Sequence, residues 1–358
     1  MITTNPADVS NKSFDFVVVG GGTAGLALAA RLSEDSSVNV AVIEAGEREF
    51  GDPKISVPAQ FGATIGDSKY DWGFSTLKQK YSNDKEFLWS RGKGLGGSSN
   101  MNFYAWIKPP AFDMDSFEKL GNPGWNWEEF SRYSKKSERF HIPDKEVTDL
   151  FPHTYNTAGR GTSGPIQTTI PPHVHTIDTL IQKTLWNLGI KKLEDSYEGD
   201  INGPWIASSN LDPKTWSRSD SATAYLLPAQ GRSNLTVLTN ALVSRVLFAD
   251  SNADGEDLTA TGVEFIHGGH SYTVNAHKEV ILSAGSIKDP QILEISGIGR
   301  RDVLSRIGVE TRVDLPGVGE NLQDHPFFGI SYELNPVSKH RTLDLLRDPE
   351  IAKEELAL

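Results

Sequence analysis

Cysteine is absent from this chain of 358 residues. Disulfide bonds, cysteine-ligated zinc or iron–sulfur centres and a thiol nucleophile are therefore excluded for this sequence. Long apolar runs are absent too. The first largely apolar run, Phe14 to Val19, is too short for the core of a signal peptide, and no stretch approaches the roughly 18 apolar residues of a membrane span. These absences predict a soluble cytoplasmic protein without a membrane partner.

Basic residues are outnumbered by acidic ones. The chain has 35 Lys and Arg against 47 Asp and Glu, which gives a formal net charge of −12. An acidic chain repels a phosphate backbone, so nucleic acid is not an expected partner, whereas a small neutral substrate is compatible with this charge. Hydrophobic residues make up 37% of the chain, which is typical of a globular protein, and its length allows two domains.

The opening of the chain predicts a Rossmann-like nucleotide-binding fold. Residues 14–20 and 38–46 have the apolar, β-branched composition of strands, and residues 26–35 between them have that of a helix. A later predicted strand, residues 279–285, also runs into a glycine turn. Residues 112–202 differ, because they are rich in Trp, Pro and charged side chains. We therefore expect an α/β fold in which an inserted cap or substrate domain interrupts the nucleotide-binding domain.

Gly20, Gly22 and Gly25 fit the pattern G-x-G-x-x-G between the first strand and the helix. The first glycine permits the tight turn, the second lets the backbone approach a pyrophosphate, and the third lets helix and strand pack closely. Glu44 ends the second strand, where it can accept hydrogen bonds from a ribose and disfavours a 2′-phosphate. The motif predicts a dinucleotide site but does not separate FAD from NAD. A purely structural glycine turn is the alternative.

A second glycine-rich loop, residues 92–99 (GKGLGGSS), leads into Asn100-Met101-Asn102. Such a loop lets backbone approach a flat ligand while hydroxyl and N–H groups bind phosphate; a flexible surface loop is the alternative. This segment resembles the first signature of the glucose–methanol–choline (GMC) oxidoreductases. Residues 285–293 and 296–299 resemble the second signature, with Asp289 where the family usually has Ser or Thr.

Further segments resemble the family in the same order along the chain. They are residues 70–72, 120–125, 161–165, 219–226 and 315–326. One departure is Lys108-Pro109, where relatives commonly have Arg-Gly after the aromatic residue at the position of Trp106. The resemblance thus spans essentially the whole chain.

The resemblance implies FAD as the cofactor and a particular domain order. Residues 12–110 and 205–330 would form the FAD-binding domain, residues 111–204 the cap insertion, and residues 331–358 the start of a truncated substrate-domain segment. The C-terminal part of the family fold is absent. Motif and resemblance together indicate these cofactor-binding residues: Gly20, Gly22, Thr23, Ala24, Gly25, Glu44, Ala45, Trp72, Gly94, Ser98, Asn102, Phe103, Tyr104, Ala105 and Val243.

Members of this family oxidise a small-molecule alcohol, with a histidine as base and the flavin as hydride acceptor. That histidine lies in the family's C-terminal portion, and none of the nine histidines here lies in a segment that resembles it, so the catalytic residues stay unassigned. His325 is interpreted as structural. His173 and His175 lack an evident third ligand, so no metal site is predicted. The alternatives are an FAD-binding protein without redox turnover, and half of a split protein that needs a complementing C-terminal chain.

Overall fold

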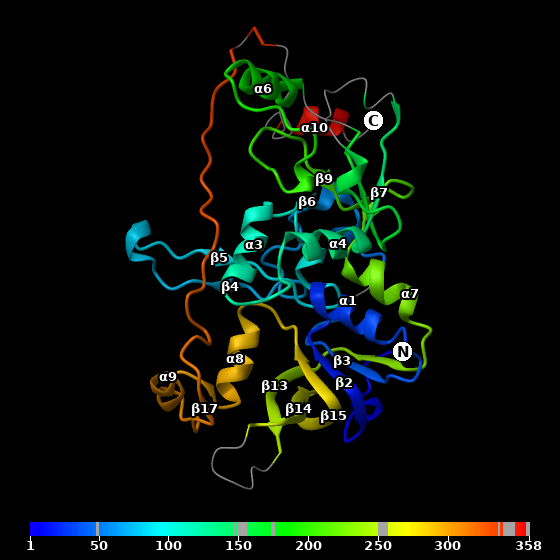
Figure 1. Cartoon of the computed structure of the whole chain (residues 1–358), viewed down its shortest axis with the longest axis vertical. Helices are drawn as coiled ribbons and strands as arrows, with labels where there is room; N and C mark the ends of the chain where they lie inside the picture. The colour runs from blue at the N-terminus through cyan, green and yellow to red at the C-terminus, as the bar shows by residue number, and fades with distance from the viewer. Residues whose placement is uncertain are drawn as a thin grey trace. The chain divides into compact units, whose positions relative to one another are not determined.

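The computed structural model describes residues 1–47, 50–145, 148, 156–172, 176–249, 257–335, 337–338 and 348–355 (Figure 1). Contacts divide the chain into two compact units. Unit 1 comprises Met1–Tyr104 and Trp216–Asp324, and unit 2 comprises Ala105–Thr215 and His325–Leu358. The domain ranges inferred from the sequence stay predictions.

A seven-stranded sheet forms the centre of unit 1, in the order β1-β12-β3-β2-β15-β14-β13. The first five strands are parallel, and β15, β14 and β13 form an antiparallel meander. The strands are β1 (Ile2–Thr3), β2 (Ser13–Val19), β3 (Val40–Ile43), β12 (Leu235–Leu238), β13 (Leu242–Phe248), β14 (Ala260–His267) and β15 (His270–Leu282). The short strands β4 (Phe74–Ser75), β5 (Leu88–Trp89), β11 (Ser217–Arg218), β16 (Ile298–Gly299) and β17 (Val313–Asp314) lie outside this sheet.

The expected sequence of strand, glycine turn, helix and strand at the start of the chain is confirmed. Residues 17–19 of β2 and all four residues of β3 are apolar and buried, as central parallel strands require. Helix α1 (Thr23–Leu32) contacts both strands and buries Gly25, Leu26, Ala29 and Ala30 (Figure 1). The other helices of unit 1 are α2 (Pro53–Ser56), α7 (Leu227–Ala229), α8 (Lys288–Ile295) and α9 (Arg301–Arg306), with the π-helical turn η7 (Ala222–Leu226).

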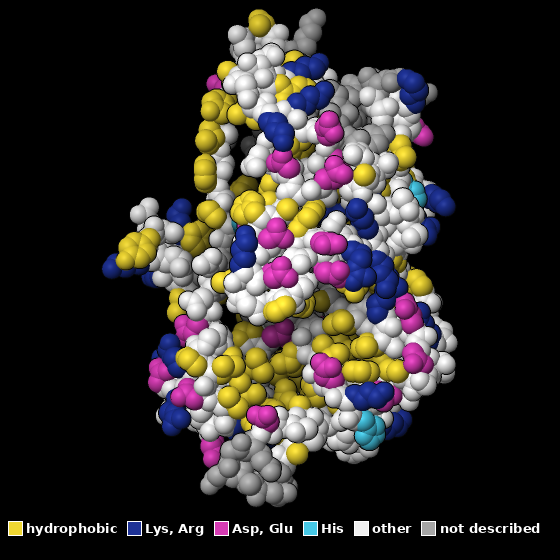
Figure 2. Space-filling view, viewed as in Figure 1, with side chains coloured by type: hydrophobic (Ala, Val, Ile, Leu, Met, Phe, Trp, Pro, Cys, Tyr) yellow, Lys and Arg dark blue, Asp and Glu magenta, His cyan; other side chains and the backbone are white. Residues whose placement is uncertain are grey.

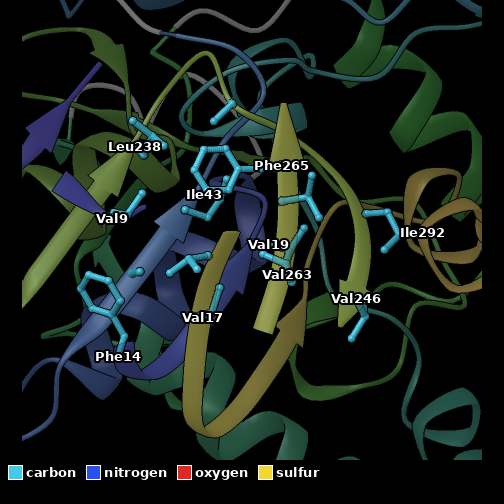
Figure 3. Close-up of a cluster of buried hydrophobic side chains, with 14 residues drawn as sticks. Val9, Phe14, Val17, Val19, Ile43, Leu238, Val246, Val263, Phe265 and Ile292 are labelled. Atoms are coloured by element: carbon cyan, nitrogen blue, oxygen red, sulfur yellow. The ribbon is translucent and has the colours of Figure 1, made fainter. Parts of the chain in front are cut away.

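The hydrophobic core of unit 1 joins the parallel strands to the meander. Val17, Val19 and Ile43 pack in one cluster with Val263 and Phe265 from β14 (Figure 3). Each such side chain stabilises the fold by about 1.5–3 kcal/mol relative to an exposed one. The carboxyl ends of β2 and β3, where a nucleotide fold binds its ligand, are therefore held on a rigid base.

Strand β15 takes part in both halves of the sheet. Its first half pairs with β14, and Glu279–Leu282 pair with β2 on the opposite side. In the described part of the chain no strand pairs with the other edge of Glu279–Leu282. Val280, Ile281 and Leu282 are only half-buried, whereas the adjacent β2 residues Val17–Val19 are fully buried.

Unit 2 contains a mixed sheet in the order β6-β9-β8-β7. Its strands are β6 (Ala105–Trp106), β7 (Glu138–His141), β8 (Ile166–Thr169), β9 (Ser208–Ser209) and β10 (Leu211–Asp212), and its helices are α3 (Ala111–Lys119), α4 (Trp127–Ser137), α6 (Thr176–Asn187) and α10 (Pro349–Glu355). In the described residues of both units, no helix is long and apolar enough to span a bilayer.

A buried charge cluster holds unit 2 together. The Arg160 guanidinium lies 3.2 Å from Glu138 Oε1 and 3.6 Å from Asp195 Oδ2, and it stacks on the Tyr197 ring. Lys108 is buried beside this cluster and donates a hydrogen bond of 2.8 Å to the carbonyl of Gly159. Burial lowers the pKa of Lys108 from 10.5 to about 8, against the attraction of Glu138.

Lys108 therefore makes the stability of unit 2 depend on pH. Between pH 8 and 10.5 the unfolded chain holds this proton and the folded chain releases it, so the free energy of unfolding rises with pH across that window. We expect a rise of about 2–3 kcal/mol in the wild type relative to Lys108→Met. Urea unfolding at a series of pH values measures the difference. The exposed Lys183→Met variant should keep the wild-type rise, and a rise that persists in Lys108→Met would contradict the assignment.

Candidate cofactor site

The glycine turn between β2 and α1 is built by backbone contacts that exclude side chains. Gly20 has φ +97°, and a Cβ there would lie 2.5 Å from the carbonyl oxygen of Ser283. A Cβ on Gly25 would lie 2.0 Å from the carbonyl oxygen of Gly20. Gly22 caps α1 and provides no side-chain acceptor, so the first-turn N–H groups, those of Thr23, Ala24 and Gly25, receive no side-chain cap. They give the turn a positive end that suits a phosphate.

Glu44 ties three glycine loops together with one buried carboxylate. Its Oε2 accepts the N–H of Gly21 at 2.7 Å, and its Oε1 accepts those of Gly46 at 2.8 Å and Gly94 at 3.0 Å. Burial raises the pKa of Glu44, and the backbone donors oppose that rise. Only 6% of the residue is exposed. The contact with a ribose that the sequence predicts stays a prediction. It would use the lone pairs of the Glu44 carboxylate that the three N–H groups do not occupy.

The signature loop of residues 92–99 docks directly on the glycine turn. Gly96 donates its N–H to the carbonyl of Gly21 at 2.8 Å, and Ser99 donates its N–H to the Thr23 hydroxyl at 3.2 Å. Ser98 accepts the N–H of Gly92 through its hydroxyl, so this side chain shapes the loop. The alternative of a flexible surface loop therefore does not describe this segment.

Trp72 is positioned by the neighbouring carboxylate of Asp71. Asp71 is buried and accepts the N–H groups of Gly66, Gly73 and Arg91 at 2.8–3.0 Å. These bonds fix the turn from which the Trp72 ring stacks on Phe74, with ring centroids 5.9 Å apart. The sequence indicated Trp72 only through its resemblance to the GMC family. The hydrogen bonds of Asp71 explain why an aspartate precedes this tryptophan, because they fix the turn that positions its ring.

These elements enclose one groove in unit 1. It brings together six of the residues predicted to bind the cofactor: Gly20, Gly22, Glu44, Ala45, Trp72 and Val243. The enclosed part measures about 70 Å³, so a dinucleotide would lie along the groove rather than inside a closed cavity. The sequence did not indicate the other ten lining residues as cofactor-binding residues: Val19, Ile43, Gly92, Gly97, Ala241, Leu242, Ser283, Ala284, Lys288 and Ile292. Four of them, Ser283, Ala284, Lys288 and Ile292, lie in or beside the second signature, whose pattern does not indicate which side chains face the groove.

The groove fits a dinucleotide by its open space as well as its donors. A Cβ on Gly22 would meet only the Cα of Gly97, at 3.8 Å, so nothing in the fold itself requires a glycine there. The space in front of that backbone is free for a ligand, in contrast to the packed positions of Gly20 and Gly25. The glycine turn, the buried carboxylate of Glu44 and the uncapped start of α1 thus all indicate a ligand that contains a diphosphate.

The residues after the signature loop are held by an arginine that the sequence analysis did not single out. Arg218 is buried and donates to the carbonyls of Ile55 at 2.8 Å and Asn102 at 2.9 Å, and to the Asn102 side chain at 2.5 Å. Its guanidinium lies 3.7 Å from the centroid of the Tyr104 ring. Tyr104 adopts φ +65°, a strained conformation for a non-glycine residue, which these contacts stabilise.

Phe103 and Ala105 are the other two residues of this segment that were predicted to contact the cofactor. Phe103 is 61% exposed and meets Phe61 edge-on, so its ring is available to a ligand. Ala105 belongs to β6 in unit 2. Whether Asn102, Phe103, Tyr104 and Ala105 contact the cofactor stays a prediction.

Asp289, the departure in the second signature, takes over the role of a turn cap. Its Oδ1 accepts the N–H of Ala284 at 2.8 Å, and its own N–H donates to the carbonyl of Gly285 at 2.9 Å. Burial raises the pKa of Asp289, and the backbone donors oppose that rise. A carboxylate at this position is therefore compatible with the turn.

No histidine lines the groove among the described residues. His141 bonds to Gln167 at 2.7 Å within unit 2, and His267 lies beside Tyr272 in the meander. His173 and His175, considered as metal ligands, lie outside the described residues, as do His153 and His340. In the described part of the chain no three metal-binding side chains cluster. The catalytic base therefore stays unassigned.

The glycine turn yields a stability test with an internal control. We expect Gly25→Ala to destabilise the chain by at least about 2 kcal/mol, because its Cβ overlaps the Gly20 carbonyl. Gly22→Ala should change the free energy of unfolding by less than about 1 kcal/mol, because its Cβ meets open space. Urea unfolding of both variants provides the comparison, and equal losses would contradict the assignment of Gly22 to a ligand.

Comparison with known proteins agrees with this geometry. A sequence profile of the GMC oxidoreductases matches residues 14–327. The chain is 42% identical over 337 residues to the GMC oxidoreductase family protein Mala s 12 of Malassezia sympodialis, covering 92% of this chain and 54% of the relative. A structure of an FAD-dependent oxidoreductase from Chaetomium thermophilum superposes with a TM-score of 0.81 at 34% identity, covering 87% of this chain and 52% of that one.

A structure described as a new fungal aryl-alcohol oxidase matches with a TM-score of 0.77 at 29% identity, and covers 87% of this chain and 52% of that one. The chain thus spans about half the length of the relatives it matches. The profile match and the identity to Mala s 12 settle the family, and with it the cofactor. The chain belongs to the GMC oxidoreductase family, whose cofactor is FAD.

Proposed function

We propose that this chain binds FAD in the unit 1 groove and forms the cofactor half of an enzyme that oxidises a small-molecule alcohol. The groove carries the proposal, because it combines an uncapped helix end, the open space before Gly22 and the buried Glu44. The aryl-alcohol oxidase among the structural relatives supports an alcohol as the substrate class.

Each part of the groove has a separate task in this proposal. The N–H groups at the start of α1 bind the diphosphate, and the carboxylate of Glu44 orients the ribose beside it. Ala45 and Val243 provide apolar and backbone surface for the adenine. When bound, FAD supplies the ring that accepts a hydride from the alcohol carbon. Arg218 keeps the backbone of Asn102 and Tyr104 fixed where that ring would lie.

We also propose that a C-terminal segment like that of the relatives completes the enzyme. The observation that favours it is the unpaired edge of Glu279–Leu282, an apolar strand in a sheet of otherwise buried parallel strands. Hydrophobic side chains gather on one face over α8 and strands β13–β15 (Figure 2). Leu242, Ile266 and Ile295 are among the exposed apolar residues of these elements. A further strand from such a segment would cover part of this surface. The same segment would also supply the catalytic base, which is unassigned in this chain.

One experiment separates these functions. The purified chain is mixed with FAD and desalted, and its absorbance is recorded before and after anaerobic addition of an aromatic primary alcohol. The measurement is repeated with the C-terminal half of Mala s 12 co-expressed. We expect retained flavin bands in both arms and bleaching by the alcohol only with the added segment, since proton removal needs a base. Gly22→Ala should stay folded and lose the flavin.

The other outcomes identify the alternatives. A chain that retains no flavin in either arm would contradict FAD binding. Flavin that is retained in both arms but never bleached would favour an FAD-binding protein without redox turnover. Bleaching of the chain alone would mean that the base lies among the histidines present here.

A further inference from the structure

The ammonium group of Lys288 is the feature of the groove that the proposed function leaves unexplained. Lys288 is the first residue of α8, and its side chain lines the groove together with Trp72 and Ser283. Its Nζ lies 4.7 Å from the centroid of the Trp72 ring and 5.5 Å from that of Phe74. The stacked aromatic pair thus holds the charge at the groove wall.

This position is unfavourable for a cation in the absence of a ligand. The start of a helix is its positive end, so an ammonium group there is repelled rather than stabilised. Partial burial lowers the pKa of Lys288, and in the described part of the chain no carboxylate forms an ion pair with it. Lys93 lies 5.3 Å from the same Trp72 ring, so a second ammonium group adds to the positive potential.

The carboxylates nearest in sequence or in the groove are engaged elsewhere. Glu44 accepts three backbone N–H groups, and Asp289 accepts the N–H of Ala284. Two other lysines that lie over aromatic rings do have acidic partners. Lys278 lies 5.8 Å from the centroid of the Phe16 ring and 3.1 Å from Asp15, and Lys54 lies 5.5 Å from that of Tyr70 and 3.0 Å from Asp67. Lys288 differs from these by facing a ligand groove instead of a carboxylate.

We propose that Lys288 is a cofactor-binding residue that pairs with the diphosphate of FAD. The inference rests on the proposed binding of FAD in this groove. The diphosphate is the anionic part of that cofactor, and lysine commonly binds phosphate as a flexible point charge. Two sources of positive potential then act on one anion: the start of α1 and the Lys288 ammonium.

The test compares ligands with and without the diphosphate. Dissociation constants for FAD, ADP and adenosine are measured by calorimetry on the wild type, Lys288→Met and Lys288→Arg. Methionine keeps the apolar stem over Trp72 and removes the charge. We expect Lys288→Met to bind FAD and ADP about tenfold more weakly and adenosine with unchanged affinity, and Lys288→Arg to stay within about threefold of the wild type. The salt dependence of FAD binding should also weaken in Lys288→Met.

The matched control is Lys278→Met, which removes a cation that lies over an aromatic ring outside the groove. It should bind all three ligands like the wild type. Unchanged FAD and ADP affinity in Lys288→Met would overturn the inference, and so would an equal loss for adenosine, which would indicate packing against the nucleoside. A wild type that binds no FAD would instead contradict the proposed function, so the two failures are distinguishable.

Discussion

The cofactor groove depends on the carboxylate of Glu44. This one side chain accepts N–H groups from the glycine turn, from the loop after β3 and from the signature loop, which are 23, 2 and 50 residues away in sequence. A buried carboxylate is costly unless its oxygens are hydrogen-bonded, and three charge-assisted bonds offset that cost. The acid expected at the ribose is thus first a structural element that holds three flexible, glycine-rich segments in register.

The same logic recurs in the surrounding loops. Asp71 accepts three backbone N–H groups and thereby positions Trp72. Arg218 donates to backbone carbonyls, including that of Asn102, and so holds Asn102 and the strained Tyr104 in place. Glycine-rich loops give a ligand close access to backbone, yet they have little side-chain packing of their own. Buried charged side chains that bind mainly backbone groups provide the missing rigidity, so the groove is preformed before any ligand arrives.

The sequence predicted the early strands, the glycine turn and the family correctly because these follow from local patterns. Valine runs, the spacing of Gly20, Gly22 and Gly25, and the two signatures need no knowledge of distant contacts. Lys288 and Arg218 escaped notice because their roles come from partners far away in sequence, such as Trp72 and Asn102. Lys108 was noticed only as a departure, since its burial beside Arg160 and Glu138 appears only in the folded unit 2.

Hydrogen exchange at the three loops tests the central role of Glu44 most directly. Glu44→Leu introduces an apolar side chain and removes both carboxylate oxygens, so none of the three N–H groups keeps its acceptor. Peptide-level exchange by mass spectrometry should then show faster exchange at Gly21, Gly46 and Gly94 together, with β2 protected as in the wild type. Unchanged protection at these loops, or a loss confined to one of them, would contradict the claim that a single carboxylate couples all three.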